Sequence, residues 1–122
     1  MIAYWKSFVD QEQTPVVICD TNHKILYMNP VACKHYEDQG GESLVGKSLL
    51  ACHPAEAAKV IDKILAWFGE DISHNRVHTF YSAKSNKDGY MVALRDEQGE
   101  LIGYYEKQIY RTPDEEALYQ MD

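Results

Sequence analysis

Two segments of this chain constrain its fold more than any other feature. Residues 15–29 combine a β-branched run, a turn and a second apolar run, which predicts a β-hairpin that leads into a helix. Residues 47–68 contain a turn followed by a long amphipathic helix. Because three more predicted strands follow, we expect an antiparallel sheet with its helices on one face. Such a fold can hold a small molecule between helices and sheet, or fill that space with its own side chains.

Length and composition describe one domain. The chain has 122 residues, of which 45% are apolar, and no apolar run approaches the roughly 20 residues needed to cross a bilayer. The N-terminus does not resemble a signal peptide, so we expect a soluble, cytoplasmic protein. Three cysteines without CxxC spacing argue against disulfides and a zinc ribbon. A formal charge of −7 argues against a nucleic-acid partner.

Residues 1–13 predict an amphipathic helix. Ile2, Trp5, Phe8 and Val9 recur at helical spacing. A helix this short is marginal alone, so these side chains must pack against the domain's own sheet or against a second copy of the chain. The pattern does not decide between these two arrangements. We expect a homodimer in which these four residues form the interface.

The remaining elements follow from periodicity and from turn residues. We expect strands at residues 16–19, 24–28, 76–84, 90–95 and 100–110, and helices at residues 30–38 and 54–68, the second ending at Gly69. Asn29 should cap the first of these helices. After Pro113, residues 114–118 should start a short acidic helix. We therefore divide the chain into a helix at 1–13, a domain at 14–111 and an acidic tail or helix at 112–122.

The order of these elements and three motifs resemble the PAS family of sensor domains. The motifs are Ile18-Cys19-Asp20 followed by a strand, Asn29 and Ala32; the step Leu44-Val45-Gly46-Lys47-Ser48-Leu49-Leu50; and the stretch from Arg95-Asp96 to Gly99 and Gly103. The resemblance covers nearly the whole chain. It implies an α+β fold with a five-stranded antiparallel sheet, helices on one face and an N-terminal amphipathic helix. It also implies a role in signal transduction, as a sensor or an interaction module.

A narrower likeness is to PAS domains found beside hemerythrin-like domains in some bacterial proteins. Those domains carry Cys-His-Pro at the head of the long helix and a Glu soon after the last-strand Gly, matched here by Cys52-His53-Pro54 and Glu106. Two positions depart from the pattern. His23 replaces the usual turn Gly, and Tyr110-Arg111-Thr112 replaces the closing Asp-Ile-Thr. Because that ending normally couples the sheet to an output helix, its replacement argues against transmission through a C-terminal coiled coil.

Two polar residues are candidates for a ligand site. An alternating last strand that turns Tyr104 and Gln108 toward a cavity turns Glu106 there as well. A buried carboxylate must be paired, hydrogen-bonded or protonated. We hypothesise that Glu106 and His53 form the polar floor of a small ligand pocket. The predicted walls are Tyr36, Ile61, Phe80, Met91 and Tyr104.

Both floor residues also have a purely structural interpretation. The His53 ring could cap the long helix or bond a backbone carbonyl group. Glu106 could lie on the outer face in solvent, because Leu101, Tyr105 and Ile109 form a second apolar set on the same strand. Periodicity alone does not decide between the two faces.

The residues argue against a haem, flavin or metal site. The long helix that Pro54 starts contains no histidine, so only His53 could supply an axial imidazole to haem. The segment around Cys52 does not match the Asn-Cys-Arg-Phe-Leu motif of the family's flavin light sensors. Cys33 and His35 would lie on divergent faces of a helix, which disfavours metal binding. The ligand, if one binds, stays unidentified from the sequence.

Catalysis is a second interpretation. Cys52 and His53 are adjacent at a helix start, where they rarely aim at one another, and no third group orients them, so we assign no catalytic residue. A small α+β cone-fold enzyme could use Glu106 or Asp20 as an acid or base. We expect instead a non-catalytic domain that binds a small ligand or a protein partner.

Overall fold

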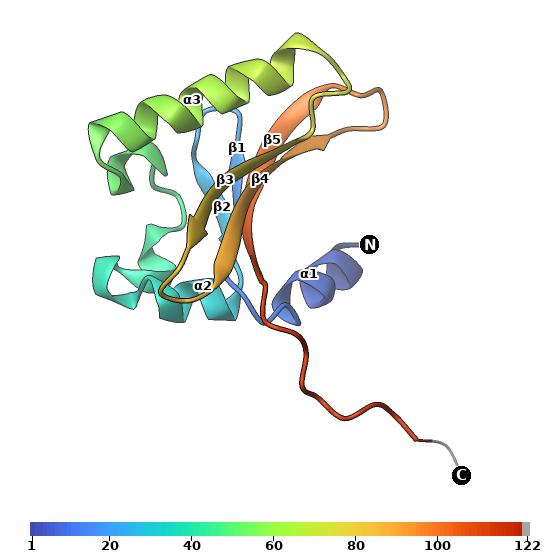
Figure 1. Ribbon diagram of the computed structural model, residues 1–122. Helices are drawn as coiled ribbons and strands as arrows, with labels where there is room; N and C mark the ends of the chain where they lie inside the picture. The colour runs from blue at the N-terminus through green and yellow to red at the C-terminus, as the bar shows by residue number, and fades with distance from the viewer. Residues whose placement is uncertain (121–122) are drawn as a thin grey trace.

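The computed structural model describes residues 1–120, which include one five-stranded antiparallel sheet. The strand order is β2-β1-β5-β4-β3, so the first hairpin pairs with the last strand at the centre of the sheet. The helices and strands in Figure 1 are α1 Ile2–Asp10, β1 Val16–Asp20, β2 Ile25–Met28, α2 Pro30–His35, α3 Ala55–Glu70, β3 Arg76–Ser82, β4 Lys87–Arg95 and β5 Leu101–Tyr110. Three short 3₁₀ turns lie between α2 and α3. The predicted α+β class and strand content are confirmed.

The first hairpin and α2 form where their residues predict. β1 and β2 pair through a tight turn in which His23 adopts a φ of 64°, an uncommon conformation for a residue with a side chain. Asn29 is buried, and its side-chain oxygen accepts the Ala32 N–H, so it caps α2 as predicted. α2 ends at His35, earlier than expected, because the chain continues in 3₁₀ turns.

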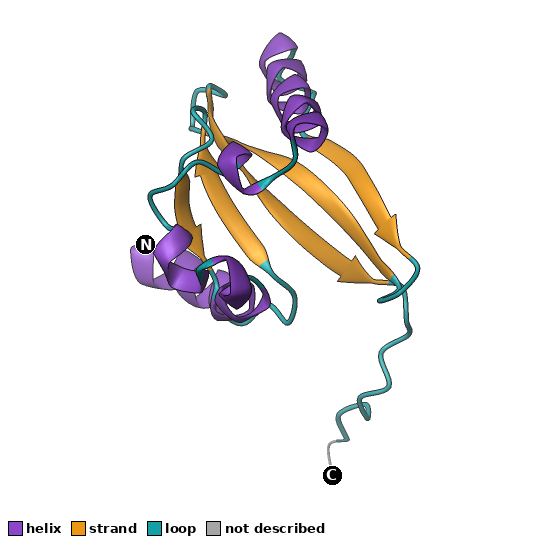
Figure 2. Cartoon of the chain, turned by 90° about the vertical axis from the view of Figure 1, so that its left-hand side faces the viewer, coloured by secondary structure: helices purple, strands orange, loops and turns teal. Residues whose placement is uncertain are grey.

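The hairpin between β3 and β4 is tighter than the sequence predicted. β4 begins at Lys87 instead of Tyr90, because Asn86 takes a left-handed φ of 52° and completes the turn in fewer residues. Gly89, expected in the loop, lies within β4, where a Cβ atom would stand only 2.0 Å from the Phe80 ring. The absence of that Cβ lets the ring lie on the strand. Figure 2 shows the five strands as one curved layer.

α3 lies on the inner face of the sheet. Its buried residues are Ile61, Ile64, Leu65 and Phe68, which follow the predicted helical spacing. The helix continues through Gly69 and ends at Glu70, one difference from the prediction. Gly69 keeps a negative φ, so it does not form the left-handed cap that a helix-ending glycine provides.

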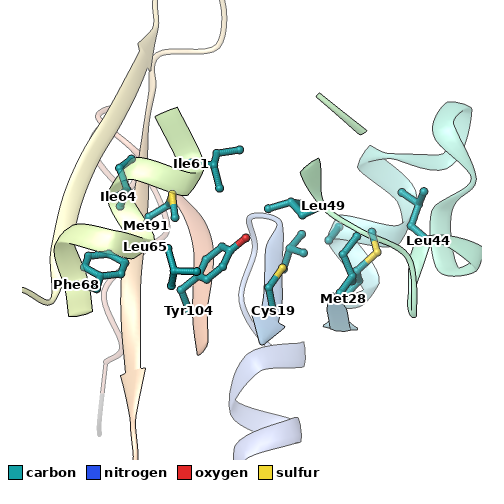
Figure 3. Close-up of a cluster of buried hydrophobic side chains, with 13 residues drawn as sticks. Cys19, Met28, Leu44, Leu49, Ile61, Ile64, Leu65, Phe68, Met91 and Tyr104 are labelled. Carbon is teal, nitrogen blue, oxygen red and sulfur yellow. The ribbon is translucent and has the colours of Figure 1, made fainter. Parts of the chain in front are cut away.

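The buried core consists of two groups of side chains that meet at Tyr104 (Figure 3). One group comes from α3 and includes Phe68, with Met91 of β4 beside it. The other group comes from the first hairpin and the 3₁₀ turns and includes Cys19 and Leu49. Tyr104 is fully buried between them. This core holds α3 and the turns against the same face of the sheet.

α1 is attached to the domain but not embedded in it. Figure 1 shows α1 and α2 on opposite sides of the strands. The Trp5 ring meets the Tyr27 ring edge-on at 5.5 Å between centroids, and the Tyr27 hydroxyl donates a hydrogen bond to Asp10. No side chain of α1 is buried, and Phe8 is 73% exposed. The helix therefore keeps an apolar surface that its own sheet does not cover.

The predicted acidic helix after Pro113 does not form within the residues described, which run to Gln120. Every described residue from Arg111 onward is exposed, so no tertiary packing supports a helix this short. None of the helices described is long and apolar enough to span a membrane.

Candidate functional site

A cavity of about 470 Å³ lies between α3 and the inner face of the sheet. Its lining comes from α3, from the end of α2 and from strands β1, β3, β4 and β5. It includes the predicted residues Tyr36, His53, Ile61, Phe80, Met91 and Glu106. Residues distant in the sequence thus meet around one space, and the hypothesis that they bind a ligand acquires a definite geometry.

Tyr104 is the predicted wall residue that the cavity does not include. Its ring is fully buried in the adjoining core. Its hydroxyl lies 2.8 Å from Nδ1 of His23, so its polar end is held at the β1–β2 turn. Burial, with the nearby Cys19 second, raises the pKa of Tyr104 well above that of a free tyrosine. Tyr104 is therefore a packing residue beside the cavity.

Glu106 lies on the inner face of β5 and lines the cavity. The outer-face alternative is excluded, because Tyr105 and Ile109 occupy that face with α1. The sequence grouped Leu101 with Tyr105 and Ile109 as one apolar face, and for Leu101 this grouping was wrong. The register shifts beside it, at Leu94 and Arg95 of β4, and Leu101 packs against the inner core instead.

Glu106 is half-buried, and its carboxyl group lacks a hydrogen-bond donor among the described residues. Burial raises the pKa of Glu106, and the positive charge of a protonated His53 opposes that rise without overcoming it. A carboxyl group in this position is stable when it carries a proton or when a partner supplies a charge or a donor.

His53 fixes the other side of the polar floor. Its Nδ1 donates a hydrogen bond of 2.8 Å to the Leu49 carbonyl oxygen, which is the structural role foreseen for this ring. That bond leaves Nε2 as the remaining nitrogen. The ring also lines the cavity, and both His53 and Glu106 border a second hollow of about 80 Å³. His53 therefore serves the backbone and the cavity together.

Two further polar side chains border the cavity. Burial, with the negative charge of Glu106 second, raises the pKa of Tyr36 to about 12, so its hydroxyl keeps its proton at neutral pH. Gln108 lines the cavity, and its Oε1 is buried without a hydrogen-bond partner among residues 1–120. Unpartnered buried amide oxygens are uncommon in native proteins.

The walls of the cavity are mainly apolar. Ile61 and Ile64 contribute from α3, and Met91 contributes from β4. Phe80 and Val60 also line it, yet they are 46% and 54% exposed. These two side chains therefore form a rim, and the cavity opens to solvent between α3 and β3.

His23 is a residue whose position the sequence analysis noted without assigning it a role. It is buried, its Nε2 donates to Asp62 of α3 at 3.0 Å, and the Tyr104 hydroxyl donates to its Nδ1. The ring thus connects the β1–β2 turn to α3 and β5. The usable signal was a bulky residue at a turn position that requires a positive φ, because such strain persists where side-chain contacts hold it.

The possible metal ligands and the buried thiol of Cys19 give little support for metal or thiol chemistry. Within residues 1–120, no group of three or more His, Cys, Asp or Glu side chains is placed to hold a metal ion. Burial, partly offset by the neighbouring Tyr104 hydroxyl, raises the pKa of Cys19 to about 12, so that thiol stays protonated. The arrangement can bind and orient a small molecule through a few polar groups in an apolar enclosure.

Comparisons with known proteins identify the fold. No family model and no curated protein sequence matches the chain. Many solved structures do match, and many of these are PAS domains. The PAS domain of Bordetella pertussis BvgS is 16% identical, with a TM-score of 0.62 and coverage of 92% of this chain and 87% of that one. A PAS domain from Colwellia psychrerythraea is 11% identical, with a TM-score of 0.65 and coverage of 89% and 95%.

A third structure is described as the Aer2 receptor from Vibrio cholerae, a dual PAS-heme oxygen sensor. It is 22% identical to this chain, with a TM-score of 0.56 and coverage of 82% of this chain and 96% of that one. At these sequence identities the comparisons support the fold alone. The five-stranded antiparallel sheet of this chain is consistent with the PAS fold of these structures.

Proposed function

This chain has the PAS fold, and we propose that it is a sensory signalling domain that binds a small molecule in the cavity between α3 and the sheet. The observation that carries the proposal is the half-buried Glu106 carboxyl group, which lines the cavity without a donor from residues 1–120. Leaving such a group unpaired costs free energy. A bound molecule that supplies the missing partner would recover that cost.

The size and lining of the cavity support the same function. Small-molecule sites commonly measure roughly 300 to 1,000 Å³ and combine apolar walls with a few convergent polar groups. Here the volume is about 470 Å³, Ile61 and Met91 provide apolar walls, and Glu106 and His53 provide the polar floor. The partly exposed rim at Phe80 offers a path of entry.

Occupancy would be transmitted through contacts that α3 makes with the sheet. A molecule in the cavity touches both α3 and β5, and His23 joins those elements through Asp62 and Tyr104. His23 lies in the turn before β2, and Tyr27 of β2 holds α1. A ligand that favours one packing of α3 would therefore shift the position of α1.

Native mass spectrometry of the protein purified from cells tests this function, with a compound library screened by thermal denaturation in parallel. We expect a retained molecule or a compound that raises the melting temperature. Ala57→Phe should remove both responses, because Ala57 lines the cavity. Ala66→Phe, on the exposed side of α3, is the matched control and should keep them. A wild-type protein with no retained molecule and no stabilising compound would contradict the proposal.

We also propose that the domain works as a homodimer through α1 and the outer face of the sheet. A hollow of about 990 Å³ on that face is lined by Trp5, Phe8 and Val9 of α1 together with apolar residues of the strands. Ile2 is exposed on the same helix. Large uncovered apolar surfaces mark interaction sites. Sedimentation should show a dimer that Phe8→Glu dissociates, and a wild-type monomer at high micromolar concentration would refute this arrangement.

Binding without turnover fits the site better than catalysis. Asp20, the other candidate acid, accepts the backbone N–H groups of Asn22 and Lys24, so it shapes the hairpin turn. The fold neighbours do not favour the cone-fold enzyme alternative. The charge of −7 and the three unpaired cysteines support a cytoplasmic domain whose partners are proteins and not nucleic acids.

A further inference from the structure

Two of the polar groups around the cavity are hydrogen-bond acceptors that lack a donor from the described residues. Glu106 offers a carboxylate, Gln108 offers a buried amide oxygen without a partner, and His53 has only Nε2 left after its bond to Leu49. The Tyr36 hydroxyl and the amide N–H groups of Gln108 are donors among these polar groups. An occupant that brings its own N–H groups would satisfy the two acceptors that have no donor.

No fixed positive charge of the cavity lining faces Glu106. Lys107 is the one lysine or arginine among the lining residues. Strand alternation places its side chain on the outer face, opposite Glu106, and Lys107 borders the outer hollow, as Gln108 also does. Besides Lys107, the titratable groups that share the cavity lining with Glu106 are His53 from the turn before α3, His35 and Tyr36 from the end of α2, and Tyr90 from β4. A bound cation would therefore meet a carboxylate that no lysine or arginine already neutralises.

Two acceptors stand at a spacing that one ammonium group can bridge. Glu106 and Gln108 alternate onto the same face of β5, so their Cα atoms are roughly 7 Å apart and their side chains are neighbours. Aromatic side chains at Tyr36 and Phe80 line the same space and can face a cation. Ile61 and the other aliphatic side chains can enclose an apolar body.

From this arrangement we infer that the cavity selects a small apolar molecule that carries a protonated amine, with the ammonium group between Glu106 and Gln108. The inference rests on the proposed function and names the chemical class of its ligand. Charge-assisted hydrogen bonds to a buried carboxylate are about twice as strong as neutral ones, so the amine is the specificity determinant. The apolar body provides the remaining affinity by burial against α3.

Isothermal titration of the whole chain with three matched series tests the inference. The probes are linear primary amines from butylamine to octylamine, the corresponding alcohols and the corresponding carboxylates, whose flexible chains adapt to the shape of the cavity. At pH 7 we expect the best amine to bind at least about tenfold more tightly than its alcohol, and the carboxylates to bind most weakly. Melting-temperature shifts of the wild type provide a second readout that requires no variant.

Variants test whether the Glu106 carboxylate is the group that binds the amine. Glu106→Gln keeps the side-chain shape and should remove the preference for the amine, so that the amine binds about as tightly as its alcohol does. Glu97→Gln, in an exposed turn, is the matched control and should leave both unchanged. Gln108→Leu should weaken amine binding less than Glu106→Gln.

Each alternative result has a distinct meaning. Equal binding of amines and alcohols would overturn the amine inference and leave the ligand-binding function intact. Preference for carboxylates would show that His53 and His35 control the site, which also overturns the inference. If no series binds or raises the melting temperature, the inference fails, and a molecule retained in native mass spectrometry would still support the proposed function.

Discussion

Tyr104 and Glu106 stand two residues apart on the same face of the same strand, yet they occupy opposite kinds of environment. Tyr104 is fully enclosed, and its hydroxyl has a partner in His23. Glu106 borders open space, and its carboxyl group has no donor from the described chain. Around Tyr104 the inner layer is solid; around Glu106 it is hollow.

The contrast teaches how a domain this small separates stability from binding. Near Tyr104, Phe68 and the C-terminal half of α3 fill the space completely. Near Glu106, small or partly exposed side chains such as Ala57 and Phe80 leave it open. Substitutions in the two regions should therefore change the free energy of unfolding by different amounts, and in opposite directions for some residues.

The largest expected effect is in the solid region. Phe68→Ala removes a fully buried ring and should lower the free energy of unfolding by about 3 to 5 kcal/mol. Phe80→Ala removes a half-exposed ring at the cavity rim and should cost about 1 kcal/mol. Urea denaturation measures both losses. Equal losses would show that the two regions are packed alike.

A smaller loss is expected when the partner of His23 is removed. Tyr104→Phe keeps the ring but leaves a buried histidine nitrogen without its hydrogen bond, at a cost of about 1 to 3 kcal/mol. Tyr105→Phe, on the outer face of the same strand, is the control and should cost less than about 0.5 kcal/mol. Denaturation in urea compares the two variants. If Tyr104→Phe is as stable as the wild type, the hydrogen bond to His23 does not contribute to stability.

In the hollow region, replacing Glu106 is expected to stabilise the folded protein instead of destabilising it. The pKa of Glu106 is raised in the folded chain, so the unfolded chain loses this proton first as pH rises. Stability should therefore fall between the ordinary glutamate pKa and the raised one, and stay lower above both. Glu106→Gln should abolish that fall and be more stable than the wild type at neutral pH, with no advantage at acidic pH. Thermal denaturation across pH measures this, and a destabilised variant at neutral pH would be the contrary result.

The smallest effect concerns a paired carboxylate on the outer face. Arg111 donates two hydrogen bonds to Asp88, at 2.7 and 2.8 Å, and lowers the pKa of Asp88 to about 2. Stability from this pair should be full above the ordinary aspartate pKa and be lost as pH falls toward about 2. Arg111→Gln should flatten that acid dependence, and added salt should weaken it. An unchanged acid profile in the variant would show that the pair contributes nothing.

Much of the fold could be predicted because its signals are local. Asn29 before Pro30 predicts a capped helix, and the spacing of apolar residues from Ile61 to Phe68 predicts the buried face of α3. Gly69 misled the prediction, since a glycine near a helix end can keep helical geometry. The acidic segment after Pro113 misled it as well, since nothing packs against it.

The candidate site was only partly predictable, because strand period leaves the choice of face open. The sequence placed Glu106 in a cavity or in solvent with equal justification, because Leu101 seemed to share a face with Tyr105 and Ile109, and only the register shift in the paired strands turns Leu101 to the inner core. The contribution of Val60 at the rim, and the exclusion of Tyr104, depend on how α3 lies over the curved sheet. No local pattern specifies that angle.

The most direct test of the account is the titration of the Glu106 side-chain carboxyl carbon by NMR in the ligand-free protein. The account predicts a midpoint above the ordinary glutamate range, which moves down when an alkylamine is bound. A midpoint at or below the ordinary range in the free protein would show that Glu106 already has a partner, and it would contradict the hollow site.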